Sequence, residues 1–299
     1  MAAGRADRLR TPTMKSLDHF VHMVRDLETA RQTWSRLGFH VRPAARHIEF
    51  GSSNAVVIFE RTYNELLWLE HCTAPALVDP YMPRLTAGEG LAHVSLTADS
   101  LAAERQRLEG LGHAVGVEGN ARRAVTMPDG RDDETDSSFL YNWQPARPFN
   151  SLFFSEHRKP DQIFIPGYVD HANGARDVTR LVWLSADPGS DLGYFRDSWG
   201  QEPESVGEDG FVFRGARGDL SEVLTSHAVR ARYGALAGAA DPGTVGGYPV
   251  AMHFRVSDPD ATRGFLAGAG VEVADLEHGI GVAAADACGA VLVFEPLSA

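Results

Sequence analysis

The sequence predicts an α+β fold in which four βαβββ modules pair into two domains. One pattern recurs four times along the 299 residues: a short apolar strand, an aspartate, a helix-length segment and a glycine. Each copy is followed by further β-rich stretches, such as NAVVIFE and ELLWLEH after the first helix. A single module of this kind buries only one face of its sheet, so the modules are expected to associate in pairs.

Each predicted helix has a polar start signal and a glycine stop signal. An aspartate at the N-cap accepts a hydrogen bond from a backbone N–H of the first turn, and a glycine past the last turn adopts the left-handed conformation that ends a helix. The aspartates are Asp26, Asp99, Asp187 and Asp258, and the glycines are Gly38, Gly112, Gly200 and Gly270. Within the first helix, an apolar stripe of Leu27, Ala30, Trp34 and Leu37 is expected to lie against a sheet.

The length of the chain favours two domains of ordinary size. We expect a disordered leader at residues 1–13, an N-terminal domain at 14–160 with the first two modules, and a C-terminal domain at 161–299 with the last two. Residues 158–176 are rich in Pro, Gly and polar residues and suit the connection. Consecutive modules are favoured as partners because connections between neighbours stay short, but pairing of the first module with the fourth remains open.

Composition narrows the classes of partner. The formal net charge of −12 disfavours nucleic acids and anionic membrane surfaces, which leaves a small molecule as the expected partner. Two cysteines, Cys72 and Cys288, indicate neither a disulfide framework nor a zinc–thiolate site and fit a reducing cytoplasm. No run of about 18 apolar residues predicts a membrane span. A homodimer is compatible with the sequence.

Several motifs resemble the vicinal oxygen chelate superfamily and, within it, its glyoxalase-like group. In the first module these are LDHFVHMVRDL, LGFHV, RHIEFGSSN and WLEH; the second adds GLAHVSLTAD, RRAVTMPDGR and FFSEH. The resemblance covers nearly the whole chain as a repeat, but it is motif-level only in the first half. It implies two paired domains of the glyoxalase, bleomycin resistance and dioxygenase type.

The same resemblance implies a metal site between paired modules, with ligands from the first and last strand of each. These positions are read as His19, Glu70, His93 and Glu156. Two imidazoles and two carboxylates suit a divalent ion such as Zn²⁺, Ni²⁺, Mn²⁺ or Fe²⁺. A displaced carboxylate, Glu156 or Glu70, would then move the proton as the catalytic group. If the first module pairs with the fourth, the set becomes His19, Glu70, His253 and Glu295.

Four further residues are expected to contact the substrate. His47 and Asn54 belong to the RHIEFGSSN motif, and Arg122 and Arg123 lie in the long loop of the second module, where they would bind an anionic group. Because strand residues two apart share a face, His22 is expected to point away from His19, His71 away from Glu70, and His157 away from Glu156. His22, His71 and His157 are therefore read as surface or packing residues.

The resulting functional hypothesis is a metal-dependent glyoxalase-like lyase or isomerase that acts on a small oxygenated metabolite. Two alternatives stay open: a small-molecule binding or resistance protein without turnover, and a ring-cleaving extradiol-type dioxygenase. In the C-terminal half Arg180 stands where the first module has His19, and an arginine cannot ligate a cation. That half is therefore expected to be a copy without metal.

Overall fold

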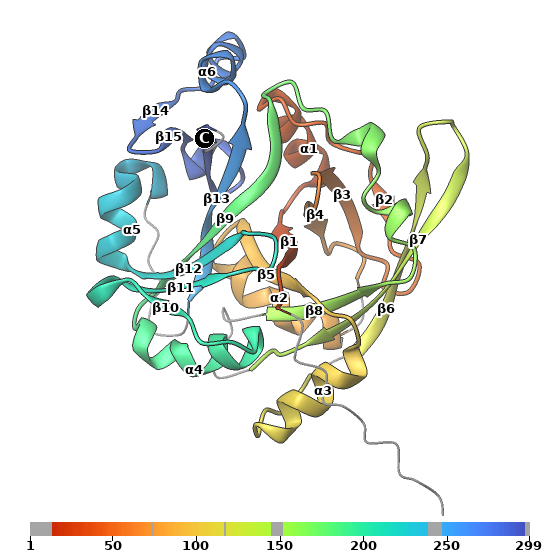
Figure 1. The fold of residues 1–299 in the computed structure, drawn as a ribbon. Helices are drawn as coiled ribbons and strands as arrows, with labels where there is room; N and C mark the ends of the chain where they lie inside the picture. Colours follow the sequence, from red (N-terminus) through yellow and green to blue (C-terminus); the bar gives the residue numbers. More distant parts are fainter. Residues whose placement is uncertain (1–13, 73–74, 117, 145–151, 239–246, 297–299) are drawn as a thin grey trace, which may run out of the picture.

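A computed structural model describes residues 14–72, 75–116, 118–144, 152–238 and 247–296 of the chain, and Figure 1 shows two curved sheets with helices on their outer sides. The predicted leader at residues 1–13 lies outside the described residues. Each sheet has eight strands and is formed by two βαβββ modules. The predicted α+β fold of four modules is thereby confirmed.

The first sheet combines modules one and two in the order β2-β3-β4-β1-β5-β8-β7-β6. At its centre β1 runs parallel to β4 and antiparallel to β5, so the two modules meet through their first strands. Its strands are β1 (Leu17–Met23), β2 (Ala45–Arg46), β3 (Ser53–Ile58), β4 (Tyr63–Trp68), β5 (Gly90–Thr97), β6 (Glu118–Thr126), β7 (Asp132–Tyr141) and β8 (Leu152–His157).

The second sheet repeats this arrangement in the order β10-β11-β12-β9-β13-β16-β15-β14. Its strands are β9 (Ala175–Ser185), β10 (Glu204–Ser205), β11 (Gly210–Arg214), β12 (Leu220–Thr225), β13 (Tyr248–Val256), β14 (Ala274–Leu276), β15 (Gly279–Val282) and β16 (Val291–Pro296). Pairing of consecutive modules is confirmed, and the alternative of first with fourth is wrong. Residues 158–174, which link the sheets, hold the short 3-10 turns η1 (Pro160–Gln162) and η2 (Pro166–Tyr168).

The module helices begin and end largely where the sequence predicts. They are α1 (Leu27–Arg36), α3 (Leu101–Gly110), α4 (Pro188–Trp199) and α6 (Pro259–Gly268). The side chains of Asp26, Asp187 and Asp258 accept from backbone N–H groups as N-caps. In the second module the cap is Ser100, because its hydroxyl lies 3.3 Å from Ala103 N, and the prediction of Asp99 is off by one residue.

Four glycines follow these helices with positive φ, as predicted: Gly38, Gly112, Gly200 and Gly270. At Gly38 a side chain would also collide with Phe265 and Asn173 of the other half. Two further helices were not predicted. The helix α2 (Pro75–Ala87) connects the two modules of the first half, and α5 (Ser226–Tyr233) connects the two modules of the second half. In the part of the chain that the structure describes, no helix is long and apolar enough to cross a membrane.

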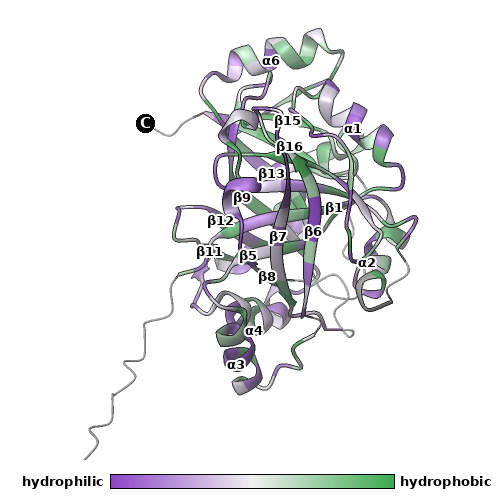
Figure 2. Ribbon diagram, turned by 90° about the vertical axis from the view of Figure 1, so that its right-hand side faces the viewer, coloured by the Kyte–Doolittle hydropathy of each residue, from purple (hydrophilic) through white to green (hydrophobic). Residues whose placement is uncertain are grey.

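The two faces of β1 serve different purposes. Leu17 and Phe20 belong to the large apolar core under the helices, whereas Val21 and Met23 face the concave side of the sheet. Figure 2 shows the outer helices α1, α3 and α6 with both hydrophilic and hydrophobic residues, as expected of helices that cover a core on one side only. His22 lies on the core side, with Nε2 2.7 Å from Cys288 O, and so points away from His19 as predicted.

Candidate functional site

A cavity opens on the concave face of the first sheet, between strands of both modules. Among the described residues that line it, eleven are apolar or aromatic and ten are polar or sulfur-bearing, so the wall offers both an apolar surface and polar groups to a small molecule. The apolar and aromatic residues are Val21, Phe50, Tyr63, Leu67, Leu69, Tyr81, Ala121, Phe139, Tyr141, Phe153 and Ile163. The polar and sulfur-bearing residues are His19, His47, Ser52, Asn54, Glu65, Cys72, Arg123, Thr135, Ser137 and Ser155.

His19 is held at this wall by a buried carboxylate. Its Nδ1 lies 2.6 Å from Asp18 Oδ1, and the ring of Tyr63 stacks on the imidazole with 4.3 Å between ring centroids and 8° between planes. In the neutral ring with Nδ1–H donating to Asp18, the other ring nitrogen, Nε2, is an acceptor. The position and tautomer of His19 are therefore set by two neighbours, as in the histidines of catalytic dyads.

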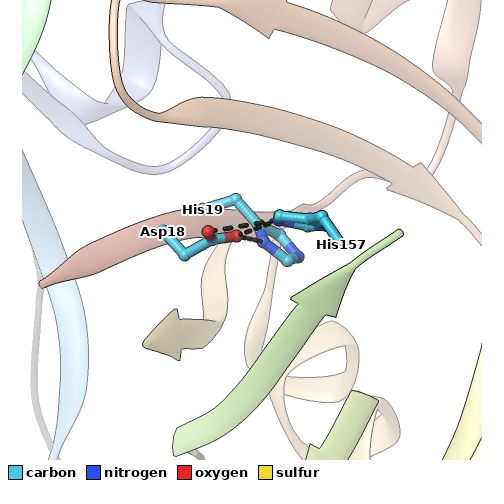
Figure 3. A group of neighbouring side chains, drawn as sticks. All are labelled: Asp18, His19 and His157. Atoms are coloured by element: carbon cyan, nitrogen blue, oxygen red, sulfur yellow. Dashed lines mark hydrogen bonds and ion pairs between the residues drawn. The ribbon is translucent and has the colours of Figure 1, made fainter. Parts of the chain in front are cut away.

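A second histidine completes this group, which we call the Asp18 triad: Asp18, His19 and His157. Figure 3 shows both imidazoles turned toward the one carboxylate. His157 Nε2 lies 2.9 Å from Asp18 Oδ1, and its Nδ1 lies 2.8 Å from the hydroxyl of Ser137, a residue of the cavity wall. Asp18 is 2% exposed, so hydrogen bonds from the two rings take the place of solvent around its carboxylate.

The triad shifts the ionisation of its members. Burial opposes the charge on Asp18, but His157 and His19 outweigh it and hold the pKa of the carboxyl well below its usual value. Burial also opposes the charge on His157, yet Asp18 outweighs it and raises the pKa of His157 above its usual value. The triad therefore keeps an ionised carboxylate behind His19.

A second polar cluster lies on the same wall. Asn54 Nδ2 donates to Glu65 Oε1 at 2.6 Å and lies 3.3 Å from His47 Nε2. His47 Nδ1 lies 2.8 Å from the Ser52 hydroxyl. Burial lowers the pKa of His47, although Glu65 opposes the shift. The RHIEFGSSN motif thus folds back so that its histidine and asparagine meet a glutamate of β4.

The two arginines of β6 have opposite surroundings. Arg123 is 8% exposed and lines the cavity, with its backbone bridged to His47. Arg122 faces solvent and pairs with Glu49 at 2.7 Å. They are consecutive residues of a strand and therefore point to opposite faces. Arg123 is placed to contact a ligand in the cavity, whereas Arg122 is not.

The structure does not assemble the predicted ligand set of His19, Glu70, His93 and Glu156. Glu70 lies in the turn after β4, more than half exposed beside His71, so these two side chains meet rather than diverge. Glu156 accepts from Leu101 N at the start of α3. His93 is buried against Tyr81 with its Nε2 2.8 Å from Pro80 O. Only His19 of the four lines the cavity.

Strand register explains the difference at the two glutamates. β8 presents Phe153 and Ser155 to the cavity, so Glu156 points to the other face, and His157, predicted to point away from the site, joins the Asp18 triad. On β4 the cavity-facing acid is Glu65, two residues beyond Tyr63, the partner of His19. Sequence reasoning missed Glu65, Asp18 and His157 as site residues, although Asp18 lies in the motif LDHFVHMVRDL.

In the second sheet the residues at the positions of His19 and Glu65 form an ion pair with each other. Glu222 lies two residues beyond Leu220, the partner of Arg180, and so corresponds to Glu65. Arg180 donates to Glu222 at 2.5 Å, and Arg232 pairs with the same carboxylate. The His253 and Glu295 side chains lie 2.6 Å apart. Arg180 is therefore held in an ion pair with Glu222, which it shares with Arg232.

Only one group of three or more metal-binding side chains is found among the residues that the structure describes, and it is the Asp18 triad. Two imidazoles and a carboxylate suit a divalent transition metal. One ligand atom from each of the three side chains lies within 4.8 Å of the other two, and the contacts of 2.6 and 2.9 Å to Asp18 Oδ1 are hydrogen-bond distances. The triad therefore fits a metal ion by donor chemistry, whereas the predicted four-residue set does not.

Comparison with known proteins agrees with this architecture. The family model described as a glyoxalase-like domain matches residues 17–192. A hypothetical protein from Staphylococcus aureus aligns with a TM-score of 0.64 at 12% identity over 95% of this chain and 100% of its own. A mutant of 4-hydroxymandelate synthase from Streptomyces coelicolor aligns with a TM-score of 0.55 at 13% identity over 88% of this chain and 77% of its own.

A fusion protein described as xylose isomerase-like TIM barrel/4-hydroxyphenylpyruvate dioxygenase aligns with a TM-score of 0.50 at 15% identity, over 90% of this chain and 42% of its own. No curated protein matches the sequence. At these identities the solved structures support the fold alone.

Proposed function

Since this chain belongs to the glyoxalase-like domain family of the vicinal oxygen chelate superfamily, we propose that it is an enzyme that moves a proton on a small oxygenated substrate in the cavity of the first sheet. The observation that carries the proposal is the pairing of His19 with buried Asp18 at the cavity wall. With its proton on Nδ1, His19 accepts a proton at Nε2.

The remaining groups support that role. The imidazolium formed when Nε2 takes a proton is stabilised by the Asp18 carboxylate, as an orienting acid stabilises a catalytic histidine. Asn54, His47 and Glu65 offer hydrogen bonds to substrate oxygens, and the apolar walls exclude water from the reacting carbon. Abstraction of a proton next to a carbonyl under these conditions is the first step of a lyase or isomerase reaction.

A second candidate is a metal-dependent enzyme in which Asp18, His19 and His157 hold a divalent ion, and the support for it is that their ligand atoms lie within 4.8 Å of one another. Such an ion would supply Lewis-acid stabilisation of substrate oxygens when bound. The two roles of His19 exclude each other. If Nδ1 held a metal ion, the proton of the neutral ring would be on Nε2, and Nε2 could not accept a proton from a substrate. Metal content therefore separates the candidates.

The test is hydrogen–deuterium exchange at the carbon next to the carbonyl of 2-oxo and 2-hydroxy acids, followed by NMR in D2O, together with metal analysis of the purified protein. We expect wild type to catalyse exchange before and after chelation, and His19→Gln to lose at least 100-fold in rate. Exchange that disappears with chelation and returns with one ion would favour the metal-dependent candidate. Exchange unaffected by His19→Gln would refute both.

A protein that binds small molecules without turnover would show ligand binding but no exchange with any substrate of the panel. An extradiol-type dioxygenase would consume oxygen with catechols and contain Fe²⁺ or Mn²⁺. An oxygen electrode distinguishes that alternative from the proposed proton transfer.

A further inference from the structure

We propose that the ligand of this cavity is a flat apolar monocarboxylate, an aryl or conjugated carboxylate, whose carboxylate binds the guanidinium of Arg123. The inference rests on the proposed function in that it concerns the same cavity, but it can be tested by binding alone. Three features carry it: a buried cation without a partner, the absence of a second strong cation in the wall, and the arrangement of the aromatic rings.

Arg123 is a buried charge that the protein does not neutralise. The residue is only 8% exposed, yet no hydrogen bond or ion pair to its guanidinium is found among the described residues. The other cations that pack into this half have such contacts: Lys15 pairs with Glu104, and Arg84 donates to three backbone carbonyls. Burial lowers the pKa of Arg123, while Tyr63 and Glu65 oppose that shift.

Glu65, the acid that acts on the charge of Arg123, already has partners of its own. Its Oε1 accepts from Asn54 at 2.6 Å and lies 3.5 Å from His47 Nε2. No oxygen of Glu65 lies within ion-pair distance of Arg123. A buried guanidinium without a carboxylate is costly, and an incoming anion would remove that cost. The donors of Arg123 match the two oxygens of a carboxylate.

The charge of the wall favours a monoanion. Arg123 is the one lysine or arginine among the described residues that line the cavity, and the pKa of the nearby His47 is lowered, so that ring is neutral at pH 7. Glu65 adds a negative charge on the same wall. A phosphate dianion would need more positive charge than one guanidinium supplies, so a carboxylate fits better.

Aromatic rings form another part of the wall. Tyr141 stacks on Phe153 with ring centroids 4.8 Å apart at 16°, and Phe139 meets Tyr141 edge to face at 5.5 Å. Phe50 in turn packs edge to face on Phe139 at 5.8 Å. These rings present flat apolar surfaces, which favour a planar, apolar ligand body. An apolar body with one carboxylate therefore satisfies both parts of the wall.

Benzoate and its neutral isostere benzamide test the proposal by calorimetric titration of the full chain. Acetate, which has the charge without the ring, and phenyl phosphate, which has the ring with a dianion, complete the panel. The variants are Arg123→Gln and, as a matched control on the other face of the same strand, Arg122→Gln. Arg123→Lys retains the positive charge but lacks the planar guanidinium. Thermal unfolding verifies that each variant is folded.

We expect wild type to bind benzoate at least tenfold more tightly than benzamide, acetate or phenyl phosphate. Arg123→Gln should lose at least tenfold in benzoate affinity while its affinity for benzamide stays within a factor of two, and Arg123→Lys should fall between. Arg122→Gln should match wild type. Equal binding of benzoate and benzamide by wild type, or full benzoate affinity in folded Arg123→Gln, would overturn the proposal, as would preferred binding of phenyl phosphate.

The variant His19→Gln keeps this test separate from the proposed function. It should keep the preference for benzoate over benzamide of at least tenfold and lack proton exchange. Loss of the Arg123 effect with exchange intact would overturn the carboxylate anchor alone. Exchange that persists in His19→Gln would overturn the proton-transfer role and leave the anchor standing.

Discussion

Asp18 and His157 are 139 residues apart in the chain, yet His157 Nε2 lies 2.9 Å from a carboxylate oxygen that is shared with His19. The contact joins the first strand of module one to the last strand of module two. It thereby couples the pairing of the modules to the position of the histidine at the cavity wall. A buried carboxylate with two imidazole partners should contribute both to stability and to function.

The first prediction concerns this coupling. Asp18→Asn offers one acceptor oxygen in place of two and removes the charge, so we expect the free energy of unfolding to fall by about 3 kcal/mol. His157→Gln should also destabilise. The double variant should lose less than the sum of the two, with a coupling energy of about 1 to 2 kcal/mol in chemical denaturation. Strictly additive losses would show that the contact does not form.

The second prediction separates the cavity from the glutamates outside it. Glu70→Gln and Glu156→Gln should leave proton exchange within a factor of two of wild type, because neither carboxylate lines the cavity. Glu156→Gln should cost about 1 kcal/mol of stability through its bond to Leu101 N. Glu65→Gln should alter substrate affinity or rate. A large loss of exchange in Glu70→Gln would contradict the placement of the site.

The third prediction concerns pH and His171, which joins the two halves. Its Nδ1 accepts from His40 N at 3.0 Å, its Nε2 donates to Ile58 O at 3.0 Å, and burial lowers the pKa of His171 to about 4. In the unfolded state the pKa of His171 is near 6.5, so between pH 6.5 and 4 the residue binds a proton in the unfolded state but not in the folded state. Stability should therefore decrease as pH falls through this window, by at most about 3 kcal/mol from this residue.

Urea denaturation at pH 7 and pH 4.5 measures that decrease. His171→Phe should be less stable at pH 7 but lose less on acidification than wild type. Part of the decrease should remain, because burial also lowers the pKa of His22 to about 4. His278→Gln, at an exposed position, is the control and should follow wild type. An unchanged pH dependence in His171→Phe would contradict a neutral His171 ring that is held by two hydrogen bonds.

The fourth prediction is that Arg123→Met stabilises the ligand-free protein. Removing an unpaired buried charge and filling its place with an apolar side chain of similar length should raise the free energy of unfolding by about 1 kcal/mol or more. The neighbouring Arg122→Met loses only an exposed ion pair with Glu49 and should change stability little. Thermal unfolding without ligand measures both, and destabilisation of Arg123→Met would show that the charge has a partner in the folded state.

The sequence by itself determined the repeat, the capped helices and the motif that carries His47 and Asn54. These features are local: an N-cap, a left-handed glycine and an apolar stripe depend on residues within a few positions of each other. It also predicted a role for Arg123 at the cavity, but it could not distinguish Arg123 from Arg122. That distinction depends on which face of β6 looks inward.

The tertiary structure decided which side chains meet in the site. Along a strand the side chains alternate between faces, so an error of one residue in register exchanges every inward and outward position. That is the reason why Ser155 and His157 face inward and Glu156 does not, and why Glu65 takes the place expected for Glu70. The Asp18 triad depends in addition on the pairing of β1 with β5 and of β5 with β8, which no local signal in the sequence fixes.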